Sequence, residues 1–140
     1  MNRTLLFDAN AIYRLIRELP DSTRHEILEA STISLAYYEL GNAVWRECSL
    51  LKRISQSEAE TLMRSLHEAL QAMGVTTPET DTQSVGVLET AIVHNLTFYD
   101  AAYLAEAKRR RKTLVTDDKQ LAKAAKEASV KTLSSADFLK

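Results

Sequence analysis

The chain has 140 residues, close to the commonest domain size, and 45% hydrophobic and 26% charged residues, a composition typical of a globular protein rather than a disordered or fibrous one. A net charge of −1 argues against a domain that binds nucleic acid through a large basic surface. If some carboxylates hold metal ions, however, the rest of the surface is mildly basic. We expect a single domain over residues 1–140.

Cysteine content and hydropathy bear on the compartment. Cys48 is the only cysteine, which excludes an internal disulfide and a cysteine-based zinc cluster and fits a reducing cytoplasm. The chain reaches Asp8 before a signal-peptide apolar core develops. No run approaches the ~20 apolar residues that span a bilayer. We therefore expect a cytoplasmic protein with no membrane-embedded segment.

The first part of the chain alternates short apolar runs with helical periodicity. Leu5, Leu6 and Phe7 form an apolar run typical of a buried strand, and a helical apolar spacing follows until Pro20. In chain order the pattern predicts a strand at 4–7, a helix at 9–19, a short helix that Asp21 or Ser22 caps and that ends near residue 30, a strand at 31–34, and a helix at 35–53.

The second part repeats this alternation. Ser55 and Glu58 carry a capping-box signature, and a long amphipathic helix follows until Gly74. A third predicted strand ends before Pro78. In chain order the remaining predictions are a strand at 75–77, helices at 85–94 and 97–111, a strand at 113–116, a helix at 118–128, and a last strand at 130–133.

Short strands alternating with longer helices predict an α/β fold with a small parallel sheet, because parallel strands need crossover connections. Helices on both faces would make a three-layer α/β/α sandwich. In such sheets, sites form beyond the carboxyl ends of the strands, where the strand order reverses. Asp8 and Asp118 each follow a predicted strand, so one edge of the sheet can hold both.

Two acids in the first part have both a structural and a functional interpretation. Asp8 either caps the next helix or binds a metal ion, with Asn10 placed to orient it or a metal-bound water. Glu39 shares a polar helix face with Asn42, a candidate supporting residue, and Arg46, a candidate substrate contact. A solvent-facing helix surface would show the same pattern, so Glu39 alone decides nothing.

The later acids are equally ambiguous in isolation. Asp100 lies three residues after Thr97, so a helix cap is its best isolated interpretation, although its small, apolar neighbours indicate a helix that begins close to other backbone. Asp117 and Asp118 follow a predicted strand, and one of them can cap a helix while the other points inward. If the acids converge, their repulsion raises their pKa values unless a cation neutralises them.

Oxygen ligands of this kind suit a hard cation such as Mg²⁺ or Mn²⁺. A bound metal ion generates a hydroxide nucleophile from water and neutralises charge on a phosphate, so the acids point to phosphodiester hydrolysis.

Four segments resemble, in order and spacing, those of PIN-domain ribonucleases, and most of all the VapC toxins. They are residues 5–12, 39–42, 99–105 and 114–121. The resemblance covers essentially the whole chain and implies a PIN-like α/β/α nuclease domain that uses Mg²⁺ or Mn²⁺ to cleave RNA endonucleolytically. It implies that Asp8, Glu39, Asp100 and Asp118 are the catalytic residues and metal ligands, that Asn10 and Thr116 support them, and that Asp117 either supports the site or shares the metal.

The toxin branch further implies a homodimer that a VapB antitoxin holds inactive. Three other functions stay open. A housekeeping PIN nuclease would have the same residues. A non-catalytic RNA- or protein-binding module is disfavoured, because four acids without metal would destabilise the site for no gain. A receiver domain also clusters acids around Mg²⁺, but it needs paired acids after its first strand, whereas Asp117 and Asp118 come late.

Overall fold

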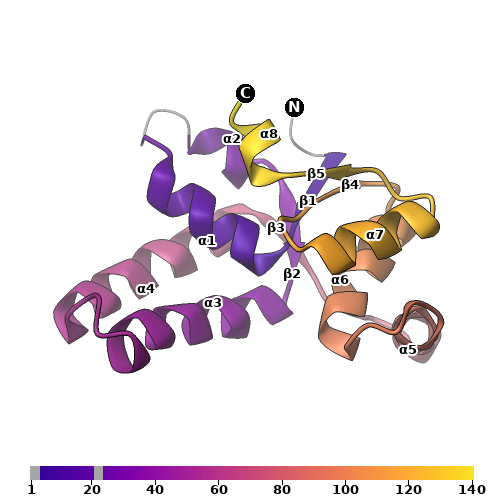
Figure 1. Ribbon diagram of the computed structural model, residues 1–140, viewed down its shortest axis with the longest axis horizontal. Helices are drawn as coiled ribbons and strands as arrows, with labels where there is room; N and C mark the ends of the chain where they lie inside the picture. The colour runs from indigo at the N-terminus through magenta and orange to yellow at the C-terminus, as the bar shows by residue number, and fades with distance from the viewer. Residues whose placement is uncertain (1–3, 21–23) are drawn as a thin grey trace.

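A computed structural model describes residues 4–20 and 24–140. Its strands form one five-stranded sheet in the order β3-β2-β1-β4-β5, and every neighbouring pair is parallel. Helices flank this sheet (Figure 1), which confirms the predicted α/β class. The strands are β1 (Leu5–Phe7), β2 (Ser31–Ile33), β3 (Gly74–Thr76), β4 (Thr113–Val115) and β5 (Thr132–Leu133).

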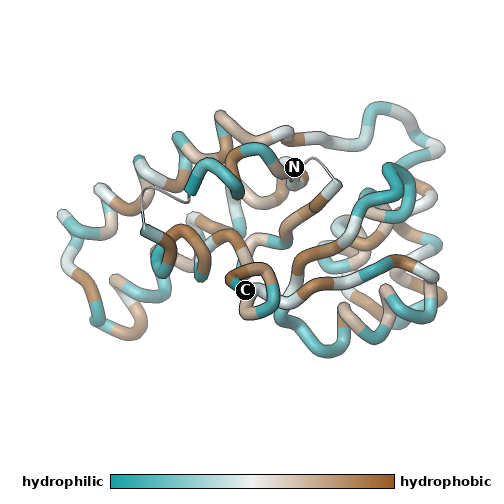
Figure 2. Tube along the Cα trace, turned by 90° about the horizontal axis from the view of Figure 1, so that it is seen from above, coloured by the Kyte–Doolittle hydropathy of each residue, from teal (hydrophilic) through white to brown (hydrophobic). Residues whose placement is uncertain are grey.

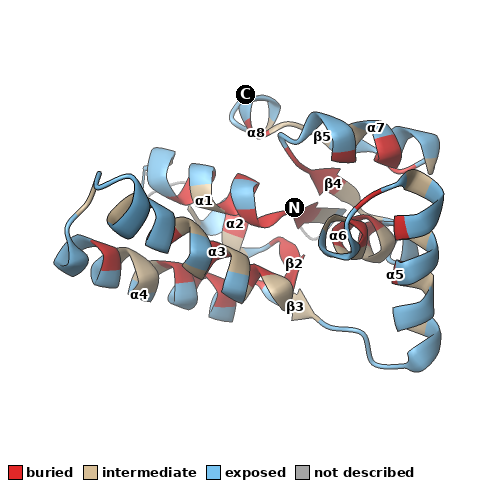
Figure 3. Ribbon diagram, turned by 60° about the horizontal axis from the view of Figure 1, so that its bottom comes forward, coloured by how far each residue is buried: buried red, intermediate tan, exposed pale blue. Residues whose placement is uncertain are grey.

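The chain builds the sheet outward from β1 in two directions. It first adds β2 and β3 on one side, and then returns to add β4 and β5 on the other. Because parallel crossovers are right-handed, this reversal sends the two sets of helices to opposite faces, as Figure 3 shows. One set is α1 (Ala9–Glu18), α2 (His25–Leu28), α3 (Leu35–Trp45) and α4 (Gln56–Ala72); the other is α5 (Asp81–His94), α6 (Phe98–Arg109) and α7 (Lys119–Glu127).

The core lies between the sheet and these helices. The strand residues Leu6 and Phe7 of β1 and Leu114 and Val115 of β4 are fully buried, because helices cover both faces of a parallel sheet. The helices expose their other sides, and hydrophobic and hydrophilic residues alternate along them (Figure 2). In the part of the chain that the structure describes, no helix has both the length and the apolar character needed to cross a membrane.

Two buried hydroxyls attach β2 to β1. Thr32 Oγ1 donates a hydrogen bond to the Phe7 carbonyl oxygen at 2.8 Å, and Ser31 Oγ donates to the Leu5 carbonyl oxygen at 2.9 Å. Buried hydroxyls must be paired to avoid a desolvation cost. These bonds fix the end of β1, and with it the start of the segment that carries Asp8.

The structure corrects several predicted boundaries. The helix predicted at 35–53 ends as α3 at Trp45 and continues as a π-helical turn, Arg46–Leu50. Helix α5 begins at Asp81 rather than at residue 85, because the Thr80 hydroxyl accepts a hydrogen bond from the Gln83 N–H and caps it. The last strand is only Thr132–Leu133. The predicted cap at Asp21 or Ser22 lies outside the described residues.

One short helix was not predicted. Helix α8 (Ser135–Phe138) begins where the Ser134 hydroxyl accepts a hydrogen bond from the Asp137 N–H. The serine with an acid three residues later is a recognisable N-cap signal. The helix packs back toward β1, where the Phe138 ring meets the Phe7 ring edge-on with 5.3 Å between centroids.

Replacing Leu114 with alanine should lower the free energy of unfolding by about 2–5 kcal/mol, because it leaves a cavity at the centre of the sheet. The matched control is Leu50→Ala, at an exposed position at the end of the π-helical turn, where the loss should stay below about 1 kcal/mol. Urea unfolding followed by circular dichroism measures both. Equal losses in the two variants would contradict this placement of the core.

Candidate active site

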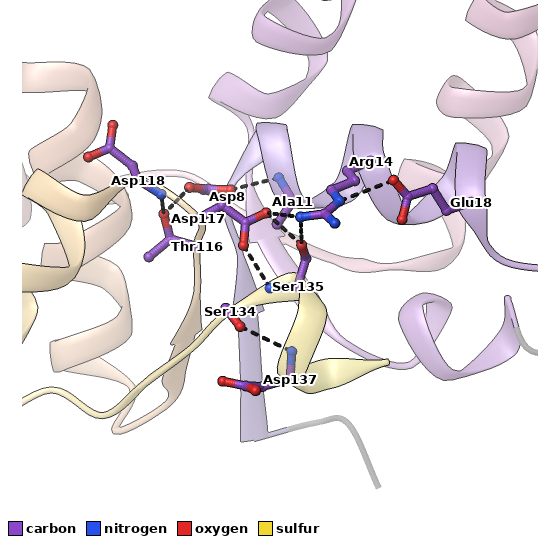
Figure 4. A network of polar contacts seen from close by, with 10 residues as sticks. All are labelled: Asp8, Ala11, Arg14, Glu18, Thr116, Asp117, Asp118, Ser134, Ser135 and Asp137. Atoms are coloured by element: carbon purple, nitrogen blue, oxygen red, sulfur yellow. Dashed lines mark hydrogen bonds and ion pairs between the residues drawn. The ribbon is translucent and has the colours of Figure 1, made fainter. Parts of the chain in front are cut away.

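Asp8 lies at the junction between β1 and α1 and is 7% exposed. Its Oδ1 accepts a hydrogen bond from the Ala11 N–H at 2.9 Å, which caps α1, and its Oδ2 accepts one from the Thr116 hydroxyl at 2.5 Å. Its own N–H donates to the Val115 carbonyl oxygen of β4. Asp8 therefore does cap the helix, and it does so from a buried position at the carboxyl end of β1, beside β4 (Figure 4).

The Thr116 hydroxyl also connects Asp8 to the segment that follows β4. The same oxygen accepts a hydrogen bond from the Asp118 N–H at 3.1 Å. The Asp118 carboxylate is exposed, accepts from the Leu121 N–H at 2.8 Å to cap α7, and points away from Asp8 (Figure 4). These contacts lie where the strand order reverses, the place where parallel sheets form their sites.

Glu39 approaches from α3, and its partner is a residue that the sequence did not single out. The Tyr103 hydroxyl donates to Glu39 Oε1 at 2.7 Å. Tyr103 lies on α6, one turn after Asp100, and is only 1% exposed. The one available signal was a tyrosine among the small, apolar neighbours of Asp100, since a buried tyrosine usually finds a polar partner.

Asp100 lies in the first turn of α6. Thr97 caps this helix by accepting a hydrogen bond from the Asp100 N–H at 3.1 Å, so the expected local cap is present. The Asp100 side chain is half-buried and faces the charges of both Glu39 and Asp118. The negative charge of Asp100 is therefore repelled both by Glu39 on α3 and by Asp118 at the start of α7.

Burial and mutual repulsion raise the pKa of three of these acids. Burial, followed by the charges of Asp117 and Glu39, raises the pKa of Asp8 from 3.8 to about 6, although its two hydrogen bonds oppose the shift. Burial and the charge of Asp100 raise the pKa of Glu39. Burial and the charge of Asp118 raise the pKa of Asp100. Pairwise repulsion thus links all four predicted acids.

Among the residues that the structure describes, 4–20 and 24–140, no cationic side chain forms an ion pair with these four acids, and the arginine, lysine and histidine ion pairs go to other carboxylates. Within the same residues, no three histidine, cysteine, aspartate or glutamate side chains form a ready-made metal site. Carboxylates that are not all in direct contact with one another still fit a cation such as Mg²⁺, because this ion binds one or two carboxylates directly and keeps bound waters.

Asp117 is turned toward the end of the chain rather than toward the other acids. Its Oδ1 accepts from the Ser135 N–H at 2.9 Å, its Oδ2 accepts from the Ser135 hydroxyl at 2.6 Å, and Arg14 Nη1 lies 3.5 Å from Oδ2 (Figure 4). Burial would raise the pKa of Asp117, but these hydrogen bonds and the Arg14 charge lower it on balance. Both carboxylate oxygens are used to attach α8.

A cleft of about 850 Å³ lies beside Glu39, between α1 and α3. Asn10, Asn42 and Arg46 line it, so the structure gathers these three predicted residues around Glu39. Asn10 is exposed, and the hydrogen bonds that Asp8 accepts come from Ala11 and Thr116 instead. The cleft wall also carries tyrosines and a second arginine: Tyr13, Tyr38, Tyr99 and Arg53.

The raised pKa of Asp8 predicts a pH-dependent stability in metal-free protein. The proton that Asp8 binds stabilises the fold fully below its ordinary pKa of 3.8, and this contribution is lost as the pH rises through about 6. Asp8→Asn stays neutral and has no such loss. Its unfolding free energy relative to wild type should therefore rise between about pH 4 and about pH 7, by up to about 3 kcal/mol.

Urea unfolding in the presence of a chelator measures this difference. Titrating groups that do not interact with Asp8 are common to both proteins and cancel in the comparison. Asp8→Asn also removes the repulsion between Asp8 and its neighbours Asp117 and Glu39, which adds to the same rise. A difference that stays constant across the pH range would show that Asp8 is not destabilised as an anion.

Comparison with known proteins identifies the fold family. A family model described as the PIN domain matches residues 5–127. Two relatives from Pyrobaculum aerophilum are similar to this chain. Exonuclease VapC9 is 33% identical over 116 residues, which cover 83% of this chain and 81% of the relative. Ribonuclease VapC3 is 32% identical over 125 residues, which cover 84% of this chain and 92% of the relative.

Solved structures agree with this result. The crystal structure of PAE2754 from Pyrobaculum aerophilum has a TM-score of 0.79 at 29% identity, covering 99% of this chain and 96% of that one. The structure of VapBC2 from Rickettsia felis, bound to a DNA fragment from its promoter, shares the fold, with a TM-score of 0.64 at 18% identity and coverage of 93% and 97%. The family model and both relatives span most of the sequence, and the chain belongs to the PIN-domain family.

Proposed function

We propose that the protein is a metal-dependent endoribonuclease and the toxin of a VapBC-type pair. The observation that carries this proposal is the set of four mutually repelling acids, without cationic partners among the described residues, around the reversal of strand order. The names of the relatives, an exonuclease and a ribonuclease, support hydrolysis of nucleic acid.

Asp8, Asp100 and Asp118 would hold Mg²⁺ or Mn²⁺, with Glu39 binding directly or through water. When bound, such an ion lowers the pKa of water to give a nucleophile and neutralises charge on the phosphate. Thr116 keeps Asp8 oriented through its hydroxyl, and the same hydroxyl fixes the backbone of Asp118. The chain itself therefore supplies oriented carboxylate oxygens, and the Asp8 carboxylate among them is buried away from solvent.

The cleft beside Glu39 is suited to an RNA strand. Arg46 and Arg53 place guanidinium groups on its wall, which favours contact with phosphates. Tyr38 and Tyr99, both strongly exposed, offer ring faces on which unstacked bases can lie. These features support a single-stranded or looped RNA substrate.

Two partner proposals follow from the family and the surface. The similarity to a VapBC complex supports a VapB-type antitoxin as partner. The outer face of α5 exposes Leu88, Ile92 and Val93 to solvent, and apolar residues gathered on one helix support burial against another chain. We infer that this face contributes to a homodimer.

Asp8→Asn should reduce Mg²⁺- or Mn²⁺-dependent RNA cleavage by more than about 100-fold, since losing a residue that merely supports a ligand already costs about 10- to 100-fold. The matched control is Asp81→Asn, which removes an exposed acid at the start of α5 and should cleave normally. Circular RNA is the substrate, because only an endonuclease can open it. Full activity of Asp8→Asn, or of wild type in a chelator, would overturn the mechanism.

Replacement by asparagine should have different effects at the adjacent residues Asp117 and Asp118. Asp118→Asn should lose most metal-dependent cleavage. Asp117→Asn should keep cleavage but lose about 1 kcal/mol of stability, because it weakens the attachment to Ser135 and Arg14. Cleavage rates and urea unfolding separate the two effects, and loss of cleavage in Asp117→Asn alone would reverse the assignment.

A further inference from the structure

The hydroxyl of Tyr103 lies at the meeting point of three helices that carry acids. Tyr103 belongs to α6, and its hydroxyl donates to Glu39 on α3 at 2.7 Å. It also interacts with the backbone N–H of Ala9, the first residue of α1 and the neighbour of Asp8. Asp100 precedes Tyr103 by three residues, and residues at this spacing lie on the same side of a helix. The Tyr103 hydroxyl thus contacts Glu39 directly, contacts the backbone next to Asp8, and belongs to the same helix as Asp100.

The hydroxyl is present for a reason other than packing. A phenylalanine would fill nearly the same space in the core, whereas a buried hydroxyl costs free energy unless it is hydrogen-bonded. Burial, the hydrogen bond and charge of Glu39, and the charge of Asp8 raise the pKa of Tyr103 well above its usual range. The hydroxyl is therefore protonated, and can donate, at neutral pH.

Glu39 in turn depends on this donor. Its carboxylate is half-buried and repelled by Asp100. In the described part of the chain, the Tyr103 hydroxyl is the one hydrogen-bond donor to the Glu39 carboxylate, which has no cationic partner there. A glutamate side chain has three rotatable bonds, and without this contact it would be free to turn into the open cleft.

We propose that Tyr103 is a positioning residue of the acidic site, whose hydroxyl holds the Glu39 carboxylate toward Asp8 and Asp100 so that it can help to bind a divalent cation. This inference rests on the proposed metal-dependent function. Tyr103 touches neither the substrate nor the ion; it acts through Glu39.

A double-mutant cycle on Mn²⁺ binding tests this role with the full chain and no RNA, by isothermal titration calorimetry. Tyr103→Phe should raise the Kd for Mn²⁺ by about 10- to 100-fold, the usual effect of losing a group that orients a ligand. In a Glu39→Gln background the same change should add nothing further. The matched control is Tyr37→Phe, which removes a hydroxyl bonded to Gln71 on α4 and should leave the Kd unchanged.

Cleavage as a function of Mn²⁺ concentration gives a second readout. Tyr103→Phe should need more Mn²⁺ for half-maximal cleavage but recover at saturating Mn²⁺, whereas general structural damage would lower the rate at every concentration. An unchanged Kd, an equal effect in both backgrounds, or a failure of Tyr103→Phe to fold would each overturn the inference. Loss of Mn²⁺ binding in Asp8→Asn alongside an unchanged Kd in Tyr103→Phe would leave the proposed function standing without it.

Discussion

The hydrogen bond from the Thr116 hydroxyl to Asp8 Oδ2 connects the ends of the two strands at which the sheet reverses its order. Strands β1 and β4 are neighbours in space but come from opposite ends of the chain. The same hydroxyl also accepts a hydrogen bond from the Asp118 N–H. It therefore fixes the position of both segments that carry acids, the one after β1 and the one after β4. The helices on the two faces then deliver the other acids to this edge, Glu39 on α3 and Asp100 on α6.

This arrangement is electrostatically unfavourable on its own. The pKa of Asp8 rises to about 6 even though two hydrogen bonds favour its charged form, so burial and neighbouring charges outweigh those bonds. The fold tolerates such a cluster because the rest of the sheet is well packed and its buried hydroxyls are paired. Strain of this kind is typical of sites that bind a ligand, since a bound cation converts the repulsion into attraction.

The parts of the structure that depend on local signals were predictable from the sequence. The cap at Ser55, the end of the long helix shortly before Gly74 and the strand predicted at 113–116, which the structure ends at Val115, follow from short patterns. The alternation of strands and helices predicts the parallel sheet. The structure also places Asp8 and Thr116 in contact. A supporting position for Thr116 beside the acids was expected from the resemblance, whereas the rule that parallel strands end at one edge was applied to Asp8 and Asp118.

Features that depend on contacts between distant elements were not predictable. The role of Asp117 could not be read from two adjacent aspartates, because it depends on Ser135 in a helix that follows a two-residue strand. Tyr103 has no local mark that separates it from an ordinary core tyrosine; its partner Glu39 is brought to it by the packing of α6 and α3. The roles of Asp117 and Tyr103 are both set by tertiary contacts, which short sequence patterns do not show.

The most direct test of the central claim, that the four acids form a cluster completed by a divalent cation, is the melting temperature of metal-free protein as Mn²⁺ is added. An ion that binds only the native state must raise the midpoint in proportion to its affinity. We predict a clear rise at neutral pH that fades below about pH 5, where Asp8 is protonated. A midpoint that does not move with Mn²⁺ or Mg²⁺ at neutral pH would contradict it.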